Sequence, residues 1–145
     1  MDGMSQQIEV LSTARCWELL RATDVGRLAI DIAGQPDIFP INYAVDGETL
    51  VFRTRAGTKL AGAAIGCFVA LEIDGVDPVE RTVWSVVVKG TAREITRAPE
   101  RDAARRLPLI PWVAELTPEF VRIEPLLVTG RRFGVVNEAR LTATG

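Results

Sequence analysis

Hydrophobic and polar positions alternate over most of this chain, which is the pattern of β-strands that pack on one side. In residues 27–32, for example, Leu28, Ile30 and Ile32 share one face. The same reasoning predicts strands over 37–45, 48–55, 67–73 and 83–95, and a final strand or pair of strands over 120–133. Asp46-Gly47 separates the second and third runs and predicts a tight hairpin, so these two strands are expected to pair antiparallel.

A few shorter stretches predict helices. Residues 12–22 repeat apolar side chains at helical spacing behind Ser12, which is a good N-cap. The alanine-rich stretch 58–65 and the stretch 99–106, which begins with proline and acidic residues, predict two more. The polar residues 1–9 are expected to form a loose segment. Because strands dominate and helices do not alternate with them, we expect a small, mainly β antiparallel barrel with short helices covering its ends.

Composition narrows the possible functions. The 145 residues suit a single domain over 1–145, and a net charge of −2 with few aromatic residues argues against nucleic-acid binding. The chain contains no histidine, which excludes a Ser-His-Asp triad and histidine-ligated zinc or haem. Cys16 and Cys67 lie far apart, and neither a secretion signal nor a membrane-spanning run is apparent, so a cytoplasmic protein with free thiols is expected.

The most informative stretch joins the third predicted strand to the second helix. Arg53 and Thr54 lie near the end of the strand, and Thr58 and Lys59 open the helix. Cations, hydroxyls and free backbone N–H groups gathered in one turn would bind an anion, most naturally a phosphate monoester. A basic turn exposed to water has the same pattern, and spacing alone slightly favours it.

Pro40-Ile41-Asn42-Tyr43 is a second candidate. A proline inside a strand points to an edge or a bulge, where backbone groups could bind the rim of a planar heterocycle. A bulged edge strand with Tyr43 half-buried is the simpler interpretation.

Trp84-Ser85 is a third candidate, since the serine could donate a hydrogen bond to a ligand. Core packing is the more frequent role of a tryptophan in such a strand.

In order along the chain, five segments resemble the pyridoxamine 5′-phosphate oxidase-like family of flavin-binding split β-barrels, in particular its small actinobacterial flavoproteins. The resemblance covers about residues 10–133. The segments are Val25-Gly26-Arg27-Leu28-Ala29, Pro40-Ile41-Asn42-Tyr43 with Asp46-Gly47, Phe52-Arg53-Thr54-Arg55-Ala56-Gly57-Thr58-Lys59-Leu60, Trp84-Ser85-Val86-Val87-Val88-Lys89-Gly90 and Thr129-Gly130-Arg131-Arg132-Phe133.

The resemblance implies a six-stranded antiparallel split barrel that forms a homodimer, with FMN sites at the subunit interface. By position, Pro40, Ile41, Asn42 and Tyr43 would lie along the isoalloxazine ring. Arg53 and Thr54 would contact the ribityl chain or the phosphate, Thr58 and Lys59 would hold the phosphate, and Trp84 and Ser85 would approach the ring from the partner subunit.

The expected function is therefore that of an FMN-dependent oxidoreductase that passes electrons between a reduced cofactor and a small organic acceptor. The pattern identifies no catalytic side chain and no metal ligand. Oxidation of pyridoxamine phosphate is not expected, because the oxidases of the family use a C-terminal arginine and histidine that this chain lacks. Two alternatives stay open: a non-catalytic dimer that binds or stores a flavin or deazaflavin, and a deazaflavin-dependent reductase.

Overall fold

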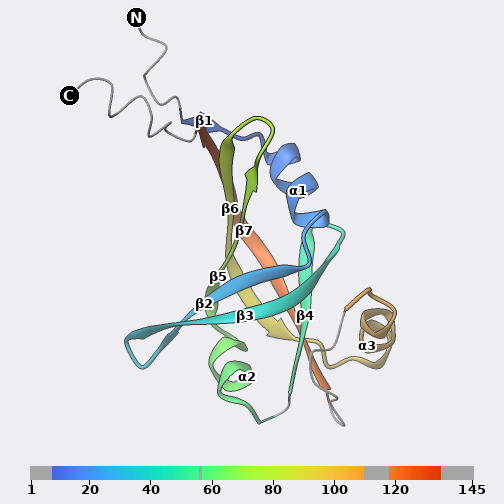
Figure 1. Cartoon of the computed structure of the whole chain (residues 1–145). Helices are drawn as coiled ribbons and strands as arrows, with labels where there is room; N and C mark the ends of the chain where they lie inside the picture. Colours follow the sequence, from blue (N-terminus) through green and yellow to red (C-terminus); the bar gives the residue numbers. More distant parts are fainter. Residues whose placement is uncertain (1–7, 56, 110–117, 135–145) are drawn as a thin grey trace, which may run out of the picture.

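The computed structural model describes residues 8–55, 57–109 and 118–134 (Figure 1). Its helices are α1 (Thr13–Arg21), α2 (Lys59–Ala64) and α3 (Ala98–Arg105). Its strands are β1 (Glu9–Val10), β2 (Val25–Ile32), β3 (Gln35–Asp46), β4 (Thr49–Arg55), β5 (Phe68–Asp77), β6 (Thr82–Glu94) and β7 (Pro118–Gly134).

The described strands form one antiparallel sheet in the order β1-β7-β4-β3-β2-β5-β6. An additional pairing of β6 with β7 closes β2–β7 into a ring, so the mainly β barrel that the sequence predicts is confirmed. The single long β7 pairs with β4 over 118–123 and with β6 over 121–134. The open choice between one final strand and two is thereby settled in favour of one.

The expected strand count of six was one short, because β1 is a seventh strand outside the ring. Glu9 and Val10 pair with Arg132 and Arg131 of β7, so Glu9, the last residue of the segment 1–9 that was expected to be loose, belongs to a strand. The Glu9 carboxylate also accepts a hydrogen bond from Arg132 Nε at 3.0 Å. A two-residue strand has no alternation to detect, and only its distant partner shows that it exists. Residues 1–7 lie outside the described part of the chain.

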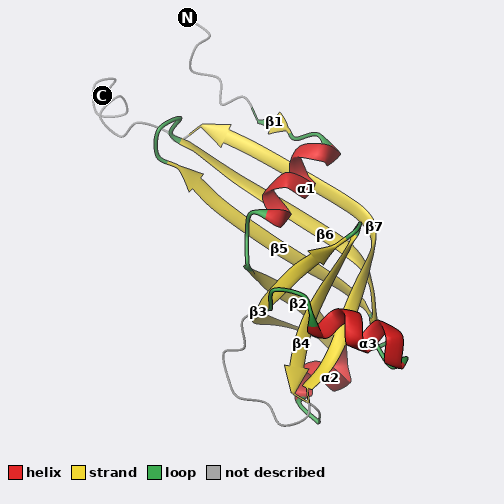
Figure 2. Cartoon of the chain, turned by 90° about the vertical axis from the view of Figure 1, so that its right-hand side faces the viewer, coloured by secondary structure: helices red, strands yellow, loops and turns green. Residues whose placement is uncertain are grey.

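The main hydrophobic core fills the ring, and a smaller cluster lies outside it. The inner cluster joins α1 to the inward faces of the strands, with Leu20, Tyr43 and Phe52 among its largest members. The outer cluster packs α3 against β4 and β7 through Val51, Ile95, Ala104 and Phe120. Figure 2 shows α1 over β6 and β7, with α3 and α2 near the other end of the molecule.

Local signals place the helices to within one or two residues. The Ser12 hydroxyl accepts a hydrogen bond from Arg15 N–H at 3.1 Å and caps α1, as predicted. Thr58 is the N-cap of α2, so this helix starts one residue later than the predicted stretch 58–65. Proline near the first position of α3 agrees with the predicted start of that helix.

A network of charges attaches α3 to the barrel. The side chain of Arg122 is only 10% exposed, and it donates to Asp46 at 2.9 Å and to Glu100 at 3.0 Å. Glu100, on α3, also accepts from Arg93 at 2.7 Å. The bonds from Arg93 and then Arg122 outweigh burial and lower the pKa of Glu100. The largely buried guanidinium of Arg122 is therefore paired on two sides.

Gly90 gives a first test of the barrel's packing. A Cβ added there would lie 2.1 Å from the carbonyl oxygen of Glu124, at the register shift between β6 and β7. Backbone cannot move as a side-chain tip can, so Gly90→Ala should lower the free energy of unfolding by about 2 kcal/mol or more. Gly62→Ala is the control, because nothing lies within 4 Å of a Cβ at that helical position. Urea denaturation should separate the two variants, and equal stabilities would contradict the described contact.

Glu100 gives a second test, through pH. Glu100→Gln should lower the free energy of unfolding at pH 7 by roughly 1–2 kcal/mol, because it removes a charge that pairs with Arg122 and Arg93. A carboxylate whose pKa is lowered by folding stabilises the protein above its unfolded pKa, and this stabilisation is lost as the pH falls through the folded pKa. The difference between wild type and variant should therefore shrink as the pH falls through the acidic range. Asp102→Asn, which removes an exposed pair with Arg105, should show little effect at any pH.

Candidate functional site at the opening between β3 and β4

β3 is paired with β2 along residues 35–42 but meets β4 only near its end. Its pairing with β4 stops at Tyr43, opposite Phe52, although β4 continues to Arg55 with β7 on its other side. Figure 1 shows the β2–β3 hairpin swinging away from the lower part of β4. We call this opening, between residues 35–42 of β3 and 53–55 of β4, the β3–β4 split.

The direction of the backbone groups of β3 explains why the pairing ends there. Tyr43 N–H donates to Asp24 O at 3.0 Å on the β2 side. Because successive residues of a strand point their backbone groups to opposite sides, those of Ile38 and Pro40 point into the split. Pro40 has no N–H, and Ile38 N–H donates to Asp37 Oδ1 at 2.9 Å. At these two positions the edge therefore presents carbonyl oxygens without a free donor, and the predicted edge position of Pro40 is confirmed.

The segment expected to lie along a cofactor ring alternates between two environments. Ile41 and Tyr43 are buried in the barrel core, where the Tyr43 hydroxyl donates to Leu20 O at 2.8 Å and burial raises the pKa of this tyrosine. Pro40 is exposed, and the side-chain amide of half-buried Asn42 donates to the carbonyl that precedes β2 at 3.0 Å. Pro40 and Asn42 can thus offer side chains at the split, whereas Ile41 and Tyr43 bury their side chains in the core and direct their backbone groups toward β2.

Arg53 and Thr54, both expected to contact the cofactor tail, lie on opposite faces of β4. Thr54 is buried on the inner face, with its Oγ1 3.2 Å from Thr58 Oγ1. Arg53 is on the face of β4 that packs toward α3. It lines a cavity of about 190 Å³ whose other lining residues are Ala104, Arg105, Leu107, Leu109, Pro118 and Phe120.

The turn after β4 holds the remaining two residues of the predicted phosphate site. The Thr58 hydroxyl accepts from Ala61 N–H at 3.2 Å and donates to Arg55 O at 2.8 Å, so it both caps α2 and stabilises the turn. Lys59, the first residue of α2, is 70% exposed. The sequence-predicted residues Thr54, Thr58 and Lys59 are therefore brought together at the end of the split where β4 meets α2.

One residue at the split was not predicted from the sequence. The Oδ2 of Asp37, on β3, lies 3.9 Å from Lys59 Nζ. Asp37 belongs to β3 and Lys59 to α2, and no local sequence pattern links them. Only the way the β2–β3 hairpin passes α2 places the carboxylate beside the lysine.

Trp84 and Ser85 are not brought to the split within one chain. In the sheet register Trp84 lies between Gly75 and Arg132, close to β1, at the opposite end of the molecule from α2 (Figures 1 and 2). Its ring covers Gly75, where an added Cβ would be 2.5 Å from Trp84 Cζ2. Ser85 points to the other face of β6, opposite Asp74 of β5.

A charged cluster also adjoins the split on the outer face of the sheet. Arg27 is opposite Pro40, and its Nη1 lies 3.3 Å from Glu72 and 2.7 Å from Asp74. Burial, together with the neighbouring Asp74 carboxylate, raises the pKa of Glu72. No local pattern links Arg27 to these carboxylates, because the arginine comes from β2 and the carboxylates from β5.

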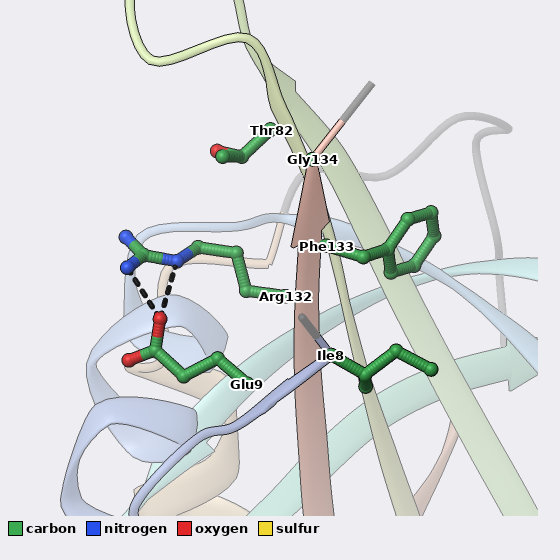
Figure 3. A pocket seen from close by; sticks show the side chains of 6 residues that line it. All are labelled: Ile8, Glu9, Thr82, Arg132, Phe133 and Gly134. Atoms are coloured by element: carbon green, nitrogen blue, oxygen red, sulfur yellow. Dashed lines mark hydrogen bonds and ion pairs between the residues drawn. The ribbon is translucent and has the colours of Figure 1, made fainter. Parts of the chain in front are cut away.

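A larger cavity, of about 510 Å³, lies at the far end of the molecule beside β1 (Figure 3). Glu9 and Arg132 face each other along one side of it and form an ion pair, with Thr82 above them. Its remaining lining residues are Ile8, Phe133 and Gly134. The sequence-predicted site residues do not line it.

Neither a metal centre nor a membrane span is seen in the part of the chain that the structure describes. No three His, Cys, Asp or Glu residues there are grouped so that they could hold a metal ion. The helices among those residues are too short or too polar to cross a membrane.

Comparison with known proteins adds to this geometry. The model of the family described as pyridoxamine 5′-phosphate oxidase matches residues 12–132. The chain belongs to the pyridoxamine 5′-phosphate oxidase family. The match spans α1 and nearly all of the ring of strands, so the resemblance seen in the five sequence segments is confirmed.

Relatives of this oxidase-family chain include proteins of known structure. An uncharacterized protein of Mycobacterium tuberculosis is 37% identical over 133 residues, which cover 88% of this chain and 87% of that protein. The FAD binding protein from Mycobacterium smegmatis is 39% identical, with 88% of this chain and all of that one covered and a TM-score of 0.81. A FAD-binding protein from Mesorhizobium loti is 25% identical, covering 90% of this chain and all of that one, with a TM-score of 0.74.

Proposed function

We propose that this chain is a flavin-dependent oxidoreductase whose cofactor lies along the β3–β4 split. The observation that carries this proposal is that one opening in the barrel combines an acceptor edge on β3 with a lysine and hydroxyl groups at its end. Family membership and the FAD-binding relatives support it.

The edge of β3 suits the rim of a flavin ring. The carbonyl oxygens of Ile38 and Pro40 point into the split, and the imide N–H of an isoalloxazine is a donor that one of them could accept. The exposed Pro40 and the half-buried Asn42 offer contacts beside this edge. Because these groups belong to a paired strand, they are already in position before a ligand arrives, which reduces the entropy cost of binding.

The cofactor's phosphate would lie at the end of the split beside Lys59. An exposed lysine can pair with a phosphate oxygen without burying an unpaired cation. Thr54 and Thr58 define the floor beside it, although the Thr58 hydroxyl is partly used by α2. Arg53, on the other face of β4, would reach the cofactor only on the outer side of the strand.

The cofactor would be FMN, with FAD as the second candidate because two relatives of known structure are FAD-binding proteins. A deazaflavin would use the same ring edge and phosphate contact. Titration of the purified protein with the three cofactors distinguishes them.

The site would be completed by a second copy of the chain. Trp84 and Ser85 lie at the opposite end of the protomer from α2, so they can reach a ring in the split only from a partner. Exposed apolar side chains on the outer face of the sheet, among them Ile38, Phe68 and Leu127, supply a surface that a partner would cover.

A bound flavin supplies the redox chemistry, by accepting and giving a hydride. The chain's own residues would hold the phosphate, align the ring against β3 and exclude water from one of its faces. Hydride transfer needs no side-chain base, which agrees with a site that lacks histidine. The protein would act on a small organic acceptor in the cytoplasm. Its free thiols Cys16 and Cys67 would remain reduced there.

Lys59→Ala tests the phosphate contact. Loss of one charged phosphate contact should weaken FMN binding about tenfold to a hundredfold, measured by the quenching of flavin fluorescence. Combining it with Arg53→Ala should weaken binding further if Arg53 also reaches the cofactor. Arg106→Ala is the matched control, since Arg106 is an exposed cation at the C-terminal end of α3, outside the surface assigned to the partner. FMN affinity unchanged by Lys59→Ala would move the site elsewhere, and flavin binding without turnover of a reduced nicotinamide would favour a non-catalytic binding protein.

A further inference from the structure

Asp37 is fixed beside the lysine of the split. Its Oδ1 accepts the hydrogen bond from Ile38 N–H at 2.9 Å, and its Oδ2 lies 3.9 Å from Lys59 Nζ. The first contact orients the carboxylate, and the second directs its charge toward the end of the split. Both side chains remain partly exposed, at 42% for Asp37 and 70% for Lys59.

The separation of 3.9 Å describes a loose ion pair. A direct hydrogen bond between an ammonium group and a carboxylate is about 2.7–2.9 Å long. Exposed pairs of this kind contribute little to stability, so the lysine can exchange this partner for another anion at low cost.

We infer that Asp37 competes with the cofactor's phosphate for Lys59, and so limits how tightly the site holds a phosphorylated flavin. This inference rests on the proposed function. A phosphate that binds Lys59 must displace the Asp37 carboxylate or lie beside it. Either way the carboxylate opposes binding, because it neutralises part of the lysine's charge and repels the phosphate.

Asp37 acts on the tail of the cofactor rather than on its ring. FMN and riboflavin share the same ring and ribityl chain and differ only in the phosphate. A carboxylate that competes for Lys59 must therefore weaken the binding of FMN and leave riboflavin nearly unaffected. The ratio of the two affinities thus isolates this role of Asp37 from any general effect on the fold.

Asp37→Asn is a conservative test, because the amide oxygen of asparagine can still accept from Ile38 N–H while the charge is removed. In titrations followed by flavin fluorescence, this variant should bind FMN about threefold to tenfold more tightly than wild type. Riboflavin affinity should change by less than about twofold. The gain for FMN should shrink at high salt, which screens exposed charges.

Asp31→Asn is the matched control. Asp31 lies on the same β2–β3 hairpin and also accepts a backbone hydrogen bond through Oδ1, from Gly34 N–H at 2.7 Å. It should leave both affinities unchanged. Thermal denaturation of each variant checks that the fold is retained.

The outcomes separate the inference from the proposed function. If Asp37→Asn leaves FMN affinity unchanged while Lys59→Ala lowers it, the inference is wrong and the proposed site stands. An equal gain for riboflavin, or an equal gain in the Lys59→Ala background, also overturns it, because the carboxylate would then act without competing for the lysine. If wild type binds neither FMN nor FAD, the proposed function itself fails.

Discussion

The structure depends on one constraint: residues 35–42 of β3 do not pair with β4, and the sequence of β3 disfavours such pairing. At Pro40 the backbone group facing β4 lacks a donor, and the N–H of Ile38 is bonded to Asp37. Pro36 lies four residues before Pro40 in the same strand and has the same orientation, so its ring nitrogen also faces the β4 side. The barrel wall therefore opens at a place set by the sequence of β3, while pairing with β2 on the other side keeps the strand in position.

The β3–β4 split presents different chemical groups along its edge and at its end. Its β3 edge carries acceptors, and the turn at the end of β4 carries Lys59 with two threonine hydroxyls. A ligand that matches needs a donor on a flat rim and a negative charge at the far end of a chain. Flavin nucleotides have this combination. Asp37 contacts both the β3 edge and the turn after β4. Its Oδ1 accepts from Ile38 N–H, and its Oδ2 faces Lys59.

Much of the fold could be predicted from the sequence, because its signals are local. Alternation of apolar residues located the strands of the ring, Asp46-Gly47 located the hairpin, and Ser12 located the start of α1. β1 was not predicted, because two residues are too few to show an alternation of apolar and polar positions and their partner strand is at the other end of the chain. The predicted fold class therefore stands, with one strand more than expected.

The candidate site was harder to predict, because it depends on which face each side chain occupies. Adjacent residues in a strand point to opposite faces, so Thr54 and Arg53 separate although both lie in the basic stretch. The hydroxyl of Tyr43 is engaged in a hydrogen bond to Leu20 O of α1, and no local pattern predicts this contact. The pairing of Asp37 with Lys59 and the distance of Trp84 from the split are consequences of tertiary structure alone.

A crystal structure of the protein with its bound flavin tests the central claim most directly. The account predicts that the ring lies against β3 at Ile38 and Pro40, that the first phosphate is within hydrogen-bonding distance of Lys59 Nζ, and that Trp84 of a second copy approaches the ring. A flavin found in the cavity beside Arg132, or against α3 with Lys59 still paired to Asp37, would contradict it.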